Sequence, residues 1–205
     1  MGKLHQKPSH RVNPLRKALL LGPHTCPWWF GYTFDNPVRK LIHDPNDILS
    51  SYVSTGQTVV DIGCGLGYFS LSLARLVGAS GHVIALDVQP QMIKRARRRA
   101  ERNGLVDRIE FQICTADHLG VTCQVDFVLA FWVVHEVVDQ NGLLEEVRSF
   151  LKPNGQLMIV EPKGHVSAAR FTNTVNLARK VGFDISEGPP IQLSRSIVCM
   201  PTHEL

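Results

Sequence analysis

The chain has 205 residues, 44% of them hydrophobic, and a formal net charge of +4 at pH 7. This size and composition predict one domain with a complete hydrophobic core. No apolar run approaches the ~20 residues that a membrane-spanning helix needs, so we expect no membrane span. The five cysteines include no C-x-x-C pair, which favours free thiols, a reducing compartment and a cytoplasmic location.

The first 44 residues differ from the rest of the chain. They hold seven Lys or Arg against only Asp35 and Asp44, and six of the twelve prolines lie within the first 45 residues. This segment is either a partly mobile tail or a basic arm that attracts an acidic acceptor or nucleic acid. Five aromatic residues lie between positions 28 and 34. They predict either ordinary core packing or a segment that folds back over the sheet.

Residues 45–53 predict a short helix capped by Asp44. The next stretch, TVVDIGCGLGYFS at residues 58–70, predicts a buried strand, a tight glycine turn and the start of a helix. Glycines allow positive φ and close approach of a ligand to the backbone. The spacing differs from the dinucleotide fingerprint G-x-G-x-x-G, because Gly67 follows Gly65 by two positions. Asp61 would repel a pyrophosphate and attract an ammonium or sulfonium, which favours S-adenosylmethionine over NAD or FAD.

Helical spacing continues from Tyr68 to Val77, and a second strand, 82–86, ends at Asp87. Asp87 lies 20 residues beyond Gly67, about where a Rossmann-type fold places the carboxylate that accepts from the ribose hydroxyls. The basic helix predicted at 90–103 turns six Lys and Arg outward, either as a solvated face or as a nucleic-acid footprint. A third strand, 109–114, is followed by Asp117 and His118.

The second half of the chain continues the alternation. A strand at 125–131 precedes VVHEVVD, in which His135 and Glu136 are the titratable residues nearest the strand end. Asp126 lies at the opposite end of this strand, so we expect it to be structural. A helical stripe at 143–151, a strand at 156–160, a helix at 167–180 and a strand pair at 183–186 and 192–199 follow. The order predicts an α/β fold, with a doubly wound, mostly parallel sheet covered by helices on both faces.

At these motifs the chain resembles the class I methyltransferases, whose first motif is matched by Asp61, Gly63, Cys64, Gly65 and Gly67. The resemblance implies seven strands with the last antiparallel, a Rossmann-like domain over residues 45–205, and a lid from residues 24 to 36 within an N-terminal arm at 1–44. It also implies that S-adenosylmethionine is the cofactor. The implied cofactor residues lie in the glycine loop and after the first four strands: Asp61, Gly63, Cys64, Gly65, Gly67, Asp87, Val88, Asp117, His118 and Phe131.

Methyl transfer from a sulfonium needs alignment and exclusion of water, and it needs no nucleophile or metal. A base is required only if the acceptor loses a proton, and His135 is the candidate for that base. The match is best to methyltransferases that act on small organic molecules. The alternatives are RNA or tRNA methylation through the basic segments, and a non-catalytic partner subunit that binds the cofactor. The sequence leaves the acceptor and the oligomeric state open.

Overall fold

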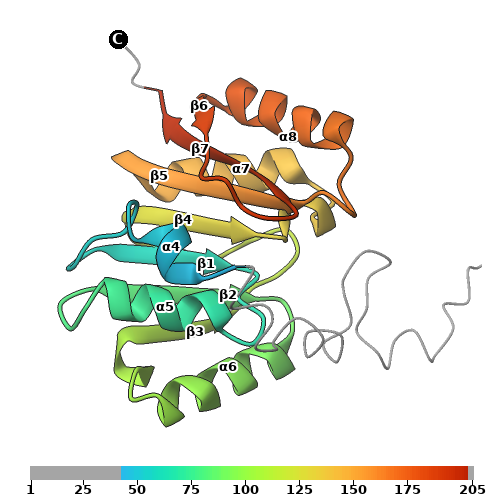
Figure 1. The fold of residues 1–205 in the computed structure, drawn as a ribbon. Helices are drawn as coiled ribbons and strands as arrows, with labels where there is room; N and C mark the ends of the chain where they lie inside the picture. Colours follow the sequence, from blue (N-terminus) through green and yellow to red (C-terminus); the bar gives the residue numbers. More distant parts are fainter. Residues whose placement is uncertain (1–42, 203–205) are drawn as a thin grey trace, which may run out of the picture.

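The computed structural model describes residues 43–202 (Figure 1). The arm and lid predicted for the N-terminal segment lie outside this range, apart from His43 and Asp44. Within residues 43–202, no helix combines the length and the apolar composition that crossing a membrane requires.

Seven strands form one mixed sheet in the order β3-β2-β1-β4-β5-β7-β6. Neighbouring strands from β3 to β5 are parallel, as the sequence predicted, and β7 is antiparallel to both β5 and β6, as the resemblance to class I methyltransferases implied. The strands are β1 (Thr58–Ile62), β2 (His82–Asp87), β3 (Ile109–Ile113), β4 (Val125–Phe131), β5 (Leu151–Pro162), β6 (Phe183–Glu187) and β7 (Ser194–Pro201).

Helices cover both faces of the sheet, and each face has its own hydrophobic core. In β4, Phe127 and Leu129 enter the core under α4, α5 and α6, whereas Val128 and Ala130 enter the core under α7 and α8. Such alternation follows from the two-residue period of a strand. The helices are α4 (Pro45–Leu49), α5 (Tyr68–Leu76), α6 (Pro90–Arg102), α7 (Gln140–Phe150) and α8 (Ala168–Val181), with short 3-10 turns η2 (Val106–Arg108) and η3 (Val134–Glu136).

Two elements differ from the sequence-based expectation. The fifth strand begins at Leu151 because residues 152–155, which predict a turn through their Pro and Gly, bulge out while pairing with β4 continues. Val125 pairs with Leu151 and Phe127 with Gln156 across this irregularity. The first described helix ends at Leu49, and a hydrogen-bonded turn replaces its expected last residues.

The amino end of β4 is held by Asp126, whose carboxylate accepts from the Thr58 N–H at 2.9 Å and from Lys152 Nζ at 2.7 Å. These contacts join β1, β4 and β5, so Asp126 is structural, as expected from its position. The carboxyl ends of the strands, on the opposite edge, are left to form the site.

Candidate functional site

A cavity of about 790 Å³ lies at the carboxyl ends of β1, β2 and β4. The strand order reverses between β1 and β4, which is where open α/β sheets bind ligands. Every residue predicted for the cofactor site except Gly67 lines this cavity, and so does His135. The lining residues from the sequence analysis are Asp61, Gly63, Cys64, Gly65, Asp87, Val88, Asp117, His118, Phe131 and His135.

Two glycines of the loop after β1 serve different purposes. Gly65 lines the cavity at φ +54°, and a Cβ added there would meet no atom within 4 Å. Its backbone is therefore open to close approach by a ligand. Gly67 has φ +75° and caps the N-terminus of α5. A Cβ on Gly67 would lie 3.1 Å from Ala96 Cβ and 3.2 Å from a Leu71 methyl group, so this glycine allows α5 to pack against α6.

Asp61 and Asp87 present buried carboxylates from the ends of β1 and β2. Asp61 Oδ2 accepts from Ser70 Oγ at 2.5 Å, which fixes the carboxylate against α5. Asp87 accepts from the Gly65 N–H at 2.9 Å and from the Gln89 N–H at 2.8 Å. Burial raises the pKa of Asp87, and these two backbone donors oppose the shift. Each Asp87 oxygen keeps acceptor capacity beyond its backbone bond, so the pair can receive two ligand hydroxyls.

The loop after β3 carries Asp117 and His118 at the other end of the cavity. Thr115 Oγ1 donates to Asp117 Oδ1 at 2.8 Å, and this bond lowers the pKa of the exposed Asp117 carboxyl. His118 Nδ1 lies 2.8 Å from Glu146 Oε1 on α7. The same carboxylate accepts from the Leu119 N–H at 2.8 Å. Sequence reasoning missed Glu146, because a glutamate on an amphipathic helix has no local signal for a contact 27 residues away.

Aromatic residues form the wall beyond β4. Trp132 has φ +60°, an unusual conformation for a bulky side chain. Its Nε1 donates to Ser194 Oγ at 3.0 Å. The His43 ring packs edge-on against Phe131 and Trp132, with centroids 5.5 Å and 5.1 Å apart. His43 Nε2 lies 2.9 Å from the carbonyl oxygen of Gln192, and these contacts hold the wall in place.

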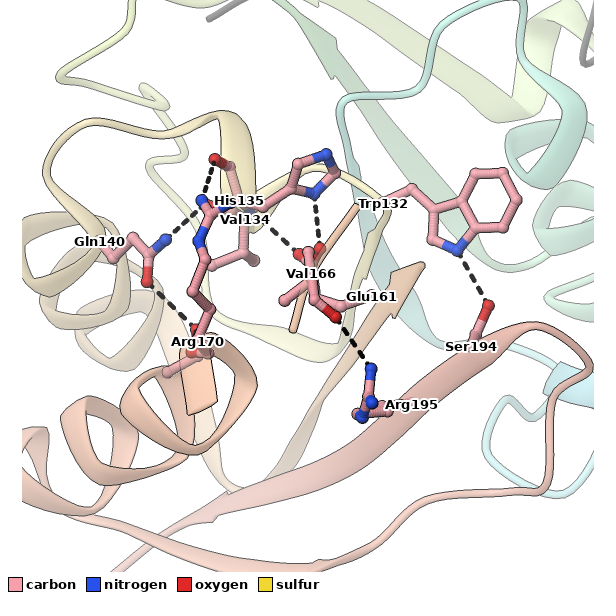
Figure 2. Close-up of polar contacts among 10 residues, drawn as sticks. Trp132, Val134, His135, Gln140, Glu161, Val166, Arg170, Ser194 and Arg195 are labelled. Atoms are coloured by element: carbon pink, nitrogen blue, oxygen red, sulfur yellow. Dashed lines mark hydrogen bonds and ion pairs between the residues drawn. The ribbon is translucent and has the colours of Figure 1, made fainter. Parts of the chain in front are cut away.

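His135 occupies η3 directly after this wall (Figure 2). Its Nδ1 is 2.5 Å from Glu161 Oε2, and its backbone N–H donates to Glu161 Oε1 at 3.1 Å. Glu161 lies near the end of β5 and is only 1% exposed. Glu161 directly follows the strand predicted at 156–160, but no local sequence pattern predicts its contact with His135.

The cysteines in the cavity wall are unsuited to nucleophilic catalysis. Burial is the main cause that raises the pKa of the Cys64 thiol, and the nearby Asp87 and Asp61 carboxylates raise it further. Burial also raises the pKa of Cys114 to about 11. Both thiols therefore stay protonated near neutral pH. Among residues 43–202, no group of three or more His, Cys, Asp or Glu is arranged to hold a metal ion.

The charge of the cavity indicates the kind of ligand that fits. Among the described residues that line it, Lys163 is the only lysine or arginine, whereas six carboxylates line it. Such a surface repels a diphosphate and attracts a cation. The open backbone at Gly65 and the paired acceptor sites of Asp87 fit the amino acid and ribose parts of a sulfonium nucleoside. The residues present thus fit S-adenosylmethionine, and the sheet order is that of the class I methyltransferases.

Comparison with known proteins agrees with this class. A profile of the family described as "Methyltransferase domain" matches residues 54–188. The chain is 33% identical over 153 residues to a ubiquinone biosynthesis O-methyltransferase of Bradyrhizobium diazoefficiens, covering 75% of this chain and 52% of that protein. It is 35% identical over 115 residues to a ubiquinone/menaquinone biosynthesis C-methyltransferase of Cellvibrio japonicus, covering 56% and 46% of the two chains.

A crystal structure of a SAM dependent methyltransferase from Aquifex aeolicus superposes with a TM-score of 0.78 at 22% identity, covering 86% of this chain and 99% of that one. The chain belongs to the methyltransferase domain family, and its fold is that of the class I S-adenosylmethionine-dependent methyltransferases. The family resemblance predicted from the glycine motif is therefore confirmed. The chain spans about half the length of the two curated relatives described above.

Proposed function

We propose that this domain binds S-adenosylmethionine and transfers its methyl group to a small organic acceptor. The observation that carries the proposal is the cavity itself, which combines an open glycine backbone at Gly65 with a carboxylate-rich wall. When bound, S-adenosylmethionine supplies an electrophilic methyl group on a sulfonium. The role of the protein is then to align the acceptor with that group and to exclude water.

The proposed cofactor contacts come from residues at the carboxyl ends of successive strands. Asp61, with the backbone at Gly63, Cys64 and Gly65, attracts the ammonium of the methionine end. Asp87 accepts from the ribose hydroxyls, with Val88 beside it. These assignments are supported by the burial and orientation of both carboxylates.

At the adenine end, Asp117 is proposed to accept from the exocyclic amine, and the His118 backbone to serve a ring nitrogen. Phe131 is proposed to pack beside the methionine end. Gly67 contributes indirectly, because it fixes the start of α5 below the loop.

The acceptor is proposed to occupy the part of the cavity near Trp132, His135 and Lys163. A small acceptor is supported by the two relatives, which are named as quinone-biosynthesis methyltransferases. The four cysteines among residues 43–202 are unpaired, which supports a reducing, cytoplasmic setting. RNA methylation, which the basic helix α6 suggested, gains no specific support from the cavity.

Titration calorimetry with S-adenosylhomocysteine tests the cofactor assignment. Two hydrogen bonds to a charged carboxylate contribute about 3 kcal/mol, so Asp87→Ala should weaken binding ~100-fold. Asp107→Ala removes an exposed aspartate outside the cavity and should bind like wild type. Circular dichroism checks that each variant is folded. Equal affinity of folded Asp87→Ala and wild type would remove Asp87 from the site.

A further inference from the structure

The contact between His135 and Glu161 differs from the other histidine–carboxylate pairs that the structure describes. The His135 side chain is 15% exposed and Glu161 only 1%, and the two approach to 2.5 Å. In the pair of His82 and Glu110, both side chains are over 40% exposed and the separation is 3.3 Å. His118 is 73% exposed. Burying a carboxylate is costly unless it is well paired. Glu161 Oε1 accepts from the His135 backbone N–H, and Glu161 Oε2 is the oxygen that contacts the His135 ring.

This contact decides which ring nitrogen of His135 faces outward. An ionised carboxylate only accepts hydrogen bonds, so the hydrogen shared with Glu161 belongs to Nδ1. In the neutral ring, Nε2 then carries a free lone pair on the side away from Glu161. Figure 2 shows the second ring nitrogen pointing away from the carboxylate. His135 lines the cavity whereas Glu161 does not, so the ring edge opposite Glu161 is the one available to a ligand in the cavity.

The turn that carries His135 is held by two further contacts, one from α7 and one from α8 (Figure 2). Gln140 Nε2 donates to the Val134 carbonyl oxygen at 3.0 Å, and Thr174 Oγ1 donates to Gln140 Oε1 at 3.2 Å. Arg170 Nη2 donates to the His135 carbonyl oxygen at 3.4 Å. Contacts from α7, α8 and β5 therefore fix both the backbone and the ring, as expected for a group whose position matters for chemistry.

We propose that the acceptor carries an aromatic hydroxyl, that His135 Nε2 removes its proton, and that Glu161 is the positioning residue that orients His135. This inference rests on the proposed methyltransferase function and adds the acceptor class and the base. Trp132, which lines the cavity close to His135 in the sequence, supplies a surface for an aromatic ring.

Methyl transfer to the hydroxyl needs no reactant beyond the acceptor and S-adenosylmethionine. The acceptor oxygen forms a C–O bond as the methyl–sulfur bond breaks, and the electron pair of that bond stays on sulfur. The hydroxyl proton passes to Nε2 of His135. The Glu161 carboxylate stabilises the resulting imidazolium, which later releases the proton to water.

The tautomer of His135 tests the proposal without turnover. Long-range proton–nitrogen correlation spectra of the full chain, with and without S-adenosylhomocysteine, should be recorded at about pH 8.5, where imidazoles are ordinarily neutral. We expect His135 to carry hydrogen on Nδ1 and a bare Nε2. Glu161→Leu should remove this preference, and Glu161→Gln should weaken it, because a single amide oxygen cannot accept from both the His135 backbone N–H and Nδ1. His135→Asn assigns the signals, and His82 serves as an exposed control. A bare Nδ1 in wild type would overturn the proposal.

Kinetics with hydroxyl acceptors of different acidity test the base. The probes are 4-methylcatechol and 4-nitrocatechol, the second being largely ionised at the same pH. His135→Asn keeps a donor toward Glu161 but has no base. It should lower kcat ~1,000-fold on 4-methylcatechol and less than tenfold on 4-nitrocatechol. Glu161→Leu should show the same pattern with a smaller loss of about 10- to 100-fold on 4-methylcatechol. The binding of S-adenosylhomocysteine should change less than twofold in both variants, and His82→Gln should behave like wild type.

Three results would overturn the acceptor and base assignment: an equal loss on both catechols, methylation of a ring carbon, or no methylated catechol from a protein that binds S-adenosylhomocysteine. A wild-type chain that fails to bind S-adenosylhomocysteine would instead refute the proposed function. The tautomer measurement still reports on His135 and Glu161 in that case, so the two failures are distinguishable.

Discussion

Replacing Glu146 by alanine should weaken cofactor binding although this residue lies on α7, outside the glycine and acid motifs. Its carboxylate receives the Leu119 N–H at 2.8 Å and 2.9 Å and the Gly120 N–H at 3.1 Å, and it contacts His118 Nδ1 at 2.8 Å. One side chain therefore holds the loop proposed to bind adenine. The side chain is 19% exposed, so its contacts are partly screened by water.

The size of the effect follows from these contacts. Two backbone bonds to a charged carboxylate contribute about 3 kcal/mol, which partial exposure reduces to about 2 kcal/mol. If the loop must be ordered to bind adenine, Glu146→Ala should weaken S-adenosylhomocysteine binding ~30-fold in titration calorimetry. Glu145→Ala is the matched control, since Glu145 is the exposed neighbour on the same helix. Unchanged affinity in a folded Glu146→Ala protein would refute the reasoning.

Two further predictions concern carboxylates at opposite edges of the sheet. Burial raises the pKa of Asp87, so as the pH falls Asp87 is protonated before an exposed aspartate is. Because the protonated group has lost its charge, calorimetry across a pH series should show the affinity for S-adenosylhomocysteine falling above the usual aspartate pKa of about 4. Constant affinity of the folded protein down to that pH would contradict this. Asp126→Ala removes the contacts with Thr58 and Lys152 at the amino end of the strands. Thermal unfolding should therefore show a free energy of unfolding lower by about 1 to 2 kcal/mol, with unchanged cofactor affinity. Weaker cofactor binding without a lower Tm would contradict a purely structural role.

The features that the sequence predicted are those encoded by neighbouring residues. The glycine loop, Asp61 and Asp87 could be placed because a strand, a turn and a helix start follow one another within a few positions. The alternation of strands and helices likewise predicted a parallel sheet with two helical layers. The resemblance to class I methyltransferases added the antiparallel last strand, which the structure confirms.

Contacts between distant parts of the chain could not be predicted in the same way. Glu161 reaches His135 because β5 lies beside β4 in the sheet, and Glu146 reaches the loop after β3 because α7 covers that end. Gly67 matches the cofactor motif, yet its neighbours are Ala96 and Leu71 rather than the cavity. A glycine required for packing between two helices and a glycine required for contact with a ligand look the same in the sequence.

We propose that the carboxylates and open glycine backbone of the cavity select an adenosyl amino acid, through its ammonium and ribose, over a dinucleotide with a diphosphate. Titration calorimetry of the wild-type chain with S-adenosylhomocysteine, and separately with NAD, measures this selectivity. We expect one S-adenosylhomocysteine to bind per chain and NAD to give no binding heat. Binding of NAD by a protein that ignores S-adenosylhomocysteine would contradict the account.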